Sequence, residues 1–390
     1  MSMRTLILVA LVVPTLSLVG CDDETSKPTK DGGADGSTDG SMDATADANV
    51  PVYLPSIDEL PEGKWSTLVP GGDTVCSRGT PYKFYVYRGT SKNLVVDYMG
   101  GGACWNSFTC KASSGLFDDS VETNAEAIFE GPDSARAGLF DMTDERNPVK
   151  TYTHVIIPYC TGDVHWGDAT QTYGEGAEAQ VIHHNGAKNS QAVLDWVYEN
   201  VVEPEVVLTT GCSAGAYGAA LWSAHVMHHY TDARNVVLAD SGAGVITSIF
   251  FGTFFPNWNA TASFPTWLEN FDLDHIDSLP DMYNLIGAEF PSNQISQFNT
   301  VEDGTQKSFY QVMGGTDTEW SEGMLTNMYE ISNATPNFNV YLGDGAQHCI
   351  IPRADFYTRE TDNVKFVDWV SDMLDGTAVD DVRCETCQLE

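Results

Sequence analysis

Basic residues are scarce in this sequence. Its 19 lysines and arginines stand against 55 aspartates and glutamates, which gives a formal net charge of −36 at pH 7. A surface with this charge repels phosphate backbones and anionic lipid headgroups. We therefore expect no nucleic-acid partner and no docking onto an anionic membrane through basic side chains, whereas the charge favours solubility outside the cell.

A long apolar run is also missing. The apolar stretch at residues 6–13 follows Arg4 and is far shorter than the roughly 20 residues that a membrane-spanning helix needs.

A charged start, a short apolar segment and small residues are typical of a signal peptide. The segment ends in Leu18-Val19-Gly20-Cys21, which resembles the lipobox of bacterial lipoproteins and implies acylation of the Cys21 thiol. We predict that residues 1–20 are a lipoprotein signal peptide and that the protein is exported to the bacterial cell envelope, meeting the membrane only through this lipid anchor. The alternative is an ordinary secretory signal with an incidental cysteine.

Residues 22–49 contain little apolar surface. Aspartates recur every four residues from Asp31 to Asp47 among glycine, serine, threonine and alanine. Such a segment cannot bury enough surface to offset the entropy of ordering it, and calcium loops need more closely spaced ligands. We predict an acidic linker over residues 21–50, including the acylated cysteine. Residues 51–390 are long enough for one large domain or two smaller ones, and we predict a single one.

Eight cysteines remain besides Cys21. An even number in an exported chain predicts disulfides, although eight cysteines allow 105 pairings. Cys104 with Cys110 is the favoured local pair. Cys384 and Cys387 resemble half of a zinc site, but the other half is missing, so a disulfide is favoured there too. Cys212 stays open between a buried thiol and half of a disulfide. We predict no metal and no cofactor.

The central motif is Gly211-Cys212-Ser213-Ala214-Gly215. It follows the apolar and β-branched residues 205–210, which predict a buried strand, and it precedes a helical pattern over residues 214–230. A serine between such a strand and helix sits on a strained turn that exposes its hydroxyl, and small neighbours let the two elements approach. We predict that Ser213 is a nucleophile.

Further strand patterns surround this motif and are followed by glycine-rich or polar loops. We expect strands at residues 83–87, 93–98, 154–160, 235–240, 308–313 and 338–342, and a helix over residues 189–200. The fold predicted from this order is an α/β-hydrolase-like, mostly parallel sheet with helices on both faces. An aromatic-rich insertion after residues 235–240 is expected to form an apolar or sugar-stacking wall. Its aromatics are Phe250, Phe251, Phe254, Phe255, Trp258, Phe264, Trp267 and Phe271.

Two loops at predicted strand ends are candidates for the rest of the site. Gly100-Gly101-Gly102 follows residues 93–98 and fits half of an oxyanion hole built from backbone N–H groups. A phosphate loop is not favoured, because no Gly-Lys-Ser/Thr follows. Asp163 and Trp166 follow residues 154–160, where they are candidates for the pocket wall or for a structural turn.

A serine nucleophile needs a base, and a histidine suits that role. Among nine histidines, only His348 follows the last predicted strand in a loop of small residues. For the carboxylate, Asp317 after residues 308–313 is the first choice, and Asp240 and Asp344 are alternatives. The order serine, aspartate, histidine is that of α/β-hydrolases.

Taken together, the motifs resemble the pectinacetylesterase and Notum family of extracellular carboxylesterases. They are Gly100-Gly101-Gly102 with Cys104 and Cys110, residues 157–163, Gly211-Cys212-Ser213-Ala214-Gly215, residues 239–242, and His348. The resemblance covers most of residues 60–355. It implies Ser213 as nucleophile, His348 as base and Asp317 as acid. It also implies that the backbone N–H groups of Gly101, Gly102 and Ala214 are the oxyanion donors.

These residues predict a serine carboxylesterase that removes acyl groups, with acetyl on polysaccharide as the expected substrate. Two alternatives remain. One is a lipase-like or polyester hydrolase that uses the aromatic insertion as an acyl pocket. The other is a catalytically silent carbohydrate-binding surface lipoprotein.

Overall fold

The computed structural model describes residues 53–131 and 137–388. The predicted signal peptide and the whole of the predicted linker, including Cys21, lie outside these residues. Within them, no helix combines the length and the apolar character needed to cross a membrane.

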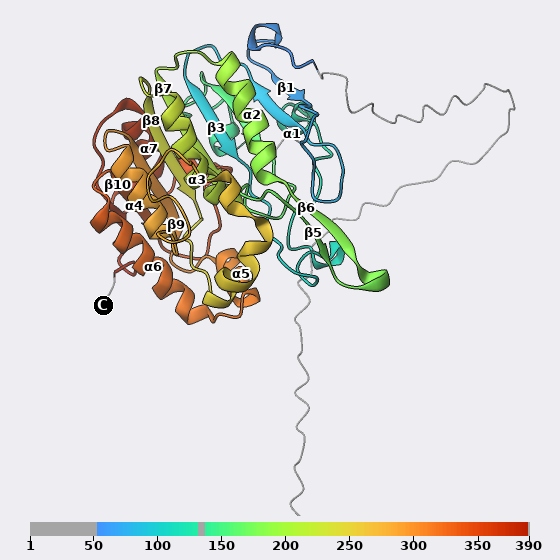
Figure 1. The fold of residues 1–390 in the computed structure, drawn as a ribbon. Helices are drawn as coiled ribbons and strands as arrows, with labels where there is room; N and C mark the ends of the chain where they lie inside the picture. The colour runs from blue at the N-terminus through green and yellow to red at the C-terminus, as the bar shows by residue number, and fades with distance from the viewer. Residues whose placement is uncertain (1–52, 132–136, 389–390) are drawn as a thin grey trace, which may run out of the picture. The chain divides into compact units, whose positions relative to one another are not determined.

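A nine-stranded sheet forms the centre of the described residues (Figure 1). Its strand order is β1-β2-β4-β3-β7-β8-β9-β10-β13. β2 pairs antiparallel with β1 and β4, and every other neighbouring pair is parallel. The strands are β1 (Trp65–Leu68), β2 (Phe84–Tyr87), β3 (Leu94–Tyr98), β4 (Thr153–Ile157), β7 (Val206–Cys212), β8 (Arg234–Asp240), β9 (Gln294–Thr300), β10 (Phe338–Gly343) and β13 (Val382–Arg383).

Two antiparallel hairpins stand apart from the sheet. One joins β5 (Ala169–Tyr173) to β6 (Gln180–His184), and the other joins β11 (Glu360–Thr361) to β12 (Val364–Lys365). The helices are α1 (Ala125–Phe129), α2 (Gly186–Asn200), α3 (Ala214–His229), α4 (Leu279–Glu289), α5 (Gly304–Val312), α6 (Asp317–Ala334) and α7 (Phe366–Asp375).

Alternating side chains give the sheet two buried faces. On β8, Val237 packs into the cluster that contains residues of α3, α4 and α6, whereas Val236 and Leu238 pack into the cluster that contains α7. Successive strand residues point to opposite faces, so a strand covered on both sides is apolar throughout. The prediction of a mostly parallel sheet with helices on both faces is confirmed.

Most of the predicted elements are present, and one is not as expected. The pattern at residues 308–313 predicted a strand, but these residues lie in and just after α5. The penultimate parallel strand before His348 is instead β9, which the sequence did not reveal. His183 and His184 end β6, and the helix that follows begins at Gly186.

Four disulfides are present among the described residues. The predicted pairs Cys104–Cys110 and Cys384–Cys387 both form. The remaining four cysteines pair as Cys76–Cys160 and Cys212–Cys349, which settles the open question about Cys212. Several disulfides are typical of exported proteins, because they persist in oxidising compartments.

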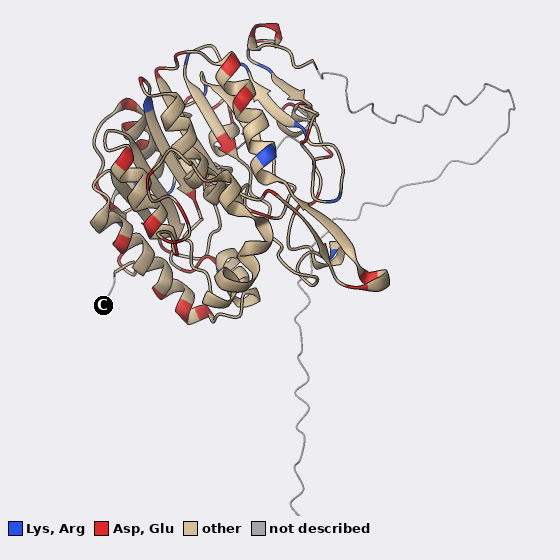
Figure 2. Ribbon diagram, in the orientation of Figure 1, with Lys and Arg blue, Asp and Glu red and all other residues tan. Residues whose placement is uncertain are grey.

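Acidic residues are spread over the ribbon of the described residues, and basic ones are few (Figure 2). The turn of the β5–β6 hairpin illustrates this, since both Glu175 and Glu178 are exposed there. Most of the ion pairs lie at the surface, where each contributes little to stability. The acidic excess therefore determines the charge of the surface rather than the packing of the core.

Asp97 is an exception, because it is a buried acid on the central strand β3. Its side chain is almost fully buried, and its Oδ2 has no hydrogen-bond partner among the described residues. Burial, followed by repulsion from Asp240, raises the pKa of Asp97 to about 8. Burial likewise raises the pKa of Asp240 to about 6, against the effect of its hydrogen bonds. At neutral pH, Asp97 is therefore mainly protonated and Asp240 mainly ionised.

These raised pKa values predict that the fold loses stability as the pH rises. A carboxyl with a higher pKa in the folded state stabilises the fold below its unfolded pKa, and this stabilisation disappears as the pH passes the folded pKa. Asp97→Asn mimics the protonated side chain. We expect the melting temperature of the wild type to fall by roughly 2–5 °C more than that of Asp97→Asn between pH 7 and pH 9. Circular dichroism melts measure this, with exposed Asp317→Asn as the control. Parallel curves for wild type and Asp97→Asn would contradict the prediction.

Candidate active site

Ser213 occupies a strained turn between β7 and α3. Its backbone has φ 60° and ψ −121°, a conformation that L-residues rarely adopt. The turn is close-packed: a Cβ on Gly211 would lie 2.3 Å from the carbonyl oxygen of Gly215, and one on Gly215 would lie 1.7 Å from that of Tyr98. Larger residues at either position would push the helix away from the sheet. The predicted strand, turn and helix are thus present around Ser213.

His348 lies in the loop after β10 and pairs with a buried carboxylate. Its Nδ1 is 2.8 Å from Oδ2 and 3.1 Å from Oδ1 of Asp303. The imidazole is partly exposed, whereas the Asp303 side chain is fully buried. When Nδ1–H donates to this carboxylate, Nε2 is left as an acceptor, which is the tautomer a general base needs.

Asp303 is the N-cap of α5. Its Oδ1 accepts hydrogen bonds from the backbone N–H groups of Thr305 at 2.9 Å and Gln306 at 3.0 Å. The side-chain amide of Gln306 also donates to Oδ2, at 3.0 Å. These donors fix the orientation of the carboxylate. Asp303 therefore faces His348 as a rigid partner.

This geometry corrects the expectation for the acid. Asp317 is the first residue of α6, is exposed, and accepts a hydrogen bond from Gln311, so it does not meet His348. The physical reason is that α5 occupies the segment expected to be the penultimate strand. Of the two alternatives, Asp344 is exposed and pairs with Arg359, and Asp240 accepts from loop amides instead of the imidazole. The expected rule, a carboxylate after the penultimate strand, holds for Asp303 after β9.

The loop after β3 and the start of α3 supply free backbone donors. Among the described residues, the N–H groups of Gly101, Gly102 and Ala214 donate to no backbone carbonyl. Gly102 has φ 77° and lines the cavity described below together with Ala214, whereas Gly101 does not line it. A side chain at Gly102 would collide with the backbone of Leu116. The loop can therefore place its N–H groups near an oxygen bound at Ser213.

Ser213 and His348 open onto one cavity of about 140 Å³. Trp166, one of the predicted wall residues, lines it and donates from its indole nitrogen to the carbonyl of Tyr217 at 2.8 Å. Most of the lining is aromatic or aliphatic. It includes Trp105, Val164, Tyr217, Val245, Ile246, Phe250, Phe251, Phe255, Trp258, Phe264, Ile276, Leu279, Met282, Phe309, Met313 and Trp320.

Asp163, the other predicted wall residue, does not line this cavity. It is fully buried and holds a turn together: Oδ1 accepts from the hydroxyl of Thr161 at 2.6 Å and Oδ2 from the N–H of Gly186 at 2.8 Å. Burial raises the pKa of Asp163 to about 6 despite these bonds. Of the two readings left open for Asp163, the structural turn is the one that its contacts support.

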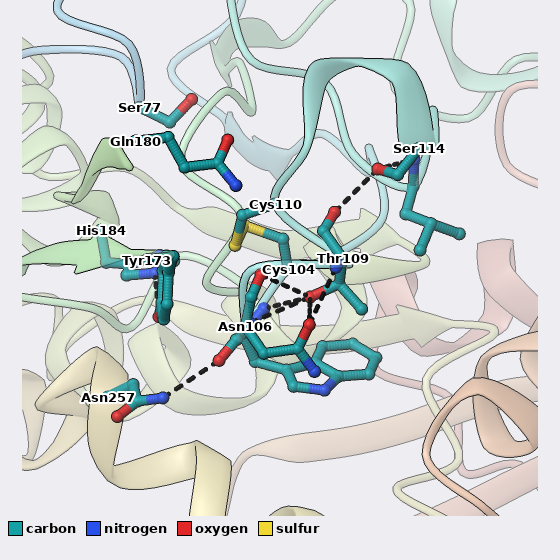
Figure 3. Close-up of a disulfide and its surroundings, with 12 residues drawn as sticks. Ser77, Cys104, Asn106, Thr109, Cys110, Ser114, Tyr173, Gln180, His184 and Asn257 are labelled. Atoms are coloured by element: carbon teal, nitrogen blue, oxygen red, sulfur yellow. Dashed lines mark hydrogen bonds between the residues drawn. A yellow bond between two sulfur atoms is a disulfide. The ribbon is translucent and has the colours of Figure 1, made fainter. Parts of the chain in front are cut away.

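The Cys104–Cys110 disulfide closes the short loop that contains Trp105 (Figure 3), and Trp105 lines the cavity. Within its loop, the hydroxyl oxygen of Thr109 accepts from the N–H groups of Trp105 at 2.8 Å and Asn106 at 3.0 Å. From the aromatic insertion, the side chain of Asn257 donates to the carbonyl of Trp105 at 3.0 Å. The insertion and the loop after β3 are thereby joined at a residue that lines the cavity.

Two groups of side chains in the described residues have the spacing of metal ligands. They are Cys104, Cys110 and His184, and Cys212, His348 and Cys349. In both groups the cysteines are joined in disulfides, so neither offers the thiolates that a metal site would use. A serine on a strained turn and a histidine paired with a carboxylate, both lining one cavity, fit nucleophilic attack by a serine on an acyl carbon.

Comparison with protein-family models matches residues 67–250 to the family described as pectinacetylesterase. The match contains the glycine loop, the turn at Ser213 and β8, and it ends before Asp303 and His348. No curated protein matches the chain. The pairing of His348 with Asp303 thus rests on the geometry alone.

A fluorophosphonate probe tests whether this geometry activates Ser213. We expect covalent labelling at Ser213, and we expect Asp303→Asn to slow it by about 10²- to 10⁴-fold, because the amide no longer holds the imidazole in the required tautomer. Asp317→Asn is the matched control and should label at the wild-type rate. Peptide mass spectrometry gives the site and the time course. Equal rates for Asp303→Asn and the wild type would remove Asp303 from the site.

Proposed function

Because residues 67–250 match the pectinacetylesterase family, we propose that the protein is a serine carboxylesterase that removes acyl groups, in particular acetyl, from polysaccharide. The observation that carries this proposal is the His348–Asp303 pair beside Ser213 on a shared cavity. A buried carboxylate that accepts from Nδ1 leaves Nε2 of the imidazole available as a base, which is what a serine nucleophile requires.

In the first half of the reaction, Ser213 Oγ attacks the ester carbonyl carbon while its proton passes to Nε2 of His348. The carbonyl oxygen becomes an oxyanion that accepts hydrogen bonds from the N–H groups of Gly102 and Ala214, with Gly101 as a further candidate donor. When the bond to the leaving oxygen breaks, the imidazolium returns the proton to that oxygen. The products are an alcohol, here a sugar hydroxyl, and an acyl-serine.

In the second half, a water molecule takes the place of the alcohol. His348 accepts a proton from the water, whose oxygen attacks the acyl carbon, and the imidazolium then protonates Ser213 Oγ as the carboxylic acid leaves. Asp303 stays ionised throughout and stabilises the transient imidazolium. The base is thus regenerated without any group beyond those of the chain and water.

The cavity favours a second candidate, a lipase-like or polyester hydrolase. Its aromatic and aliphatic lining offers few partners for sugar hydroxyls, and an apolar acyl chain would bury its surface there favourably. On this view the polar part of the substrate stays at the mouth and the acyl chain enters. The two candidates share the same chemistry and differ in what occupies the aromatic wall.

Esters of p-nitrophenol with acyl chains of increasing length separate the candidates. An acetyl-specific enzyme should show kcat/KM that falls beyond two to four carbons. A lipase-like enzyme should gain up to about 3-fold to 4-fold per added CH₂ until the cavity is full, because each buried methylene contributes about 0.8 kcal/mol. Released acetate from acetylated polysaccharides provides the direct assay of the first candidate.

Ser213→Ala is the control for both assays, since it removes the nucleophile and leaves the cavity intact. Its turnover should fall to background on every ester. Equal turnover in the wild type and Ser213→Ala would sink both hydrolase candidates and favour the carbohydrate-binding lipoprotein.

The four disulfides support export of the protein. We propose in addition that the lipid on Cys21 tethers the enzyme to the envelope, so that it acts on polymer outside the cytoplasm. Mass spectrometry of the mature N-terminus tests this, and the expected result is a chain that begins at an acylated Cys21. Cys21→Ser should abolish both the modification and membrane fractionation. An unmodified cysteine would contradict anchoring.

A further inference from the structure

The loop that carries His348 is bound to the end of β8 by consecutive backbone amides. Oδ2 of Asp240 accepts hydrogen bonds from the N–H groups of Ile350 at 2.7 Å and Ile351 at 2.9 Å. The hydroxyl oxygen of Ser241 accepts from the N–H of Cys349 at 2.9 Å. Asp240 and Ser241 thus fix the three residues that follow His348.

Asp240 and Ser241 are themselves held rigidly. Both are buried, and the hydroxyl of Ser241 donates to Oδ1 of Asp240 at 3.0 Å. Ser241 has φ 63° and Cys349 has φ 59°, so both loops keep backbone conformations that need support from their surroundings. The hydrogen bonds between them supply that support.

Asp240 also holds the turn that contains Ser213. The backbone carbonyl of Asp240 accepts from the N–H of Ser213 at 2.8 Å. Next to this bond, the disulfide Cys212–Cys349 joins the residue before Ser213 to the residue after His348, across 137 positions of sequence. Backbone, side chain and disulfide therefore connect the two loops at one place.

We propose that Asp240, Ser241 and the Cys212–Cys349 disulfide form a clamp that positions His348 relative to Ser213 for the reaction. This inference rests on the proposed function. The residues of the clamp are positioning residues, because they act through the backbone of the two catalytic loops. Asp303 orients the imidazole through Nδ1, and the clamp fixes the backbone position of His348.

Positioning of this kind affects the rate more than substrate binding. A displacement of about 1 Å between nucleophile and base can lower turnover by about 10²-fold, because the proton transfer needs a short, aligned contact. The cavity that holds the substrate is built mainly from other segments, so KM should change little when the clamp is released.

The first test removes the disulfide with Cys212→Ala/Cys349→Ala. We expect kcat for a p-nitrophenyl ester to fall by at least about tenfold with KM within about threefold of wild type, because the loops separate while the cavity remains. The rate of fluorophosphonate labelling at Ser213 should fall in parallel. Both are measured well below the melting temperature of each variant.

Cys76→Ala/Cys160→Ala is the matched control. It also removes a disulfide that closes a long loop, with a sequence separation of 84, and neither cysteine lines the cavity. We expect it to lower the melting temperature and leave kcat close to wild type. Similar losses of kcat in both disulfide variants would overturn the proposal, since a general loss of stability would then explain them.

The second test changes Asp240, so that the clamp can be tested even if the disulfide variant folds poorly. Asp240→Asn retains a carbonyl oxygen that can accept from Ile350 and Ile351, whereas Asp240→Ala leaves both buried amides without an acceptor. We expect the asparagine variant to keep a kcat at least about tenfold above that of the alanine variant, at similar KM. Equal kcat values in the two folded variants, both at wild-type level, would overturn the clamp.

The two readouts separate this inference from the proposed function. If the wild type hydrolyses no ester but Ser213 still reacts with the probe, the proposed function fails, and the labelling rates of the variants still decide the clamp. If the wild type hydrolyses esters and the disulfide variant matches it in kcat and labelling, the clamp fails alone.

Discussion

The turn at Ser213 is the constraint to which the surrounding elements are fitted. Ser213 has a positive φ, and the strand before it and the helix after it lie very close together. Gly211 and Gly215 allow this, because a side chain at either position would collide with the backbone carbonyl of Tyr98. The strand order then places β3 on one side of β7 and β8 on the other. The glycine loop after β3 and Asp240 at the end of β8 thus reach the serine from its two neighbouring strands, at the carboxyl edge where open α/β sheets bind ligands.

A second feature, the polar strand β9, links this edge to the core. Its buried residues Gln297 and Asn299 hydrogen-bond to each other, and Asn299 accepts from Gln306. Gln306 in turn donates to Asp303, the partner of His348. A fully satisfied chain of polar side chains inside a protein is rigid, because each broken bond would leave a buried group without a partner. The orientation of the carboxylate is therefore determined by the packing of the sheet.

The sequence predicted the sheet class and the strand, turn and helix around Ser213, because these depend on local patterns: apolar runs at strands, small residues at a turn and a helical pattern after it. It missed β9, because the segment QISQFNT has the composition of a surface loop. Its polar side chains are buried against partners from distant segments, such as the carbonyl of Val237 for Ser296 and the side chain of Gln306 for Asn299. That miss moved the expected acid to Asp317. The partner of Cys212 was equally out of reach, since a sequence separation of 137 leaves no local signal. The role of Asp163 was ambiguous for a related reason. An aspartate after a strand can line a pocket or hold a turn, and the N–H of Gly186, which donates to Asp163, comes from a segment that is distant in sequence.

The Cys212–Cys349 disulfide also has a consequence for the maturation of the protein. Closing a loop of this length removes conformational entropy from the unfolded chain equivalent to about 5 kcal/mol in the loop-entropy model. Cys212 ends β7 and Cys349 lies in the loop after β10, and the folded sheet brings these two positions together. If Cys212–Cys349 positions His348 as proposed, oxidation of these two cysteines is a step that full activity requires. A chain still in a reducing compartment would contain the serine, the histidine and the aspartate, yet remain a slow catalyst until it was exported.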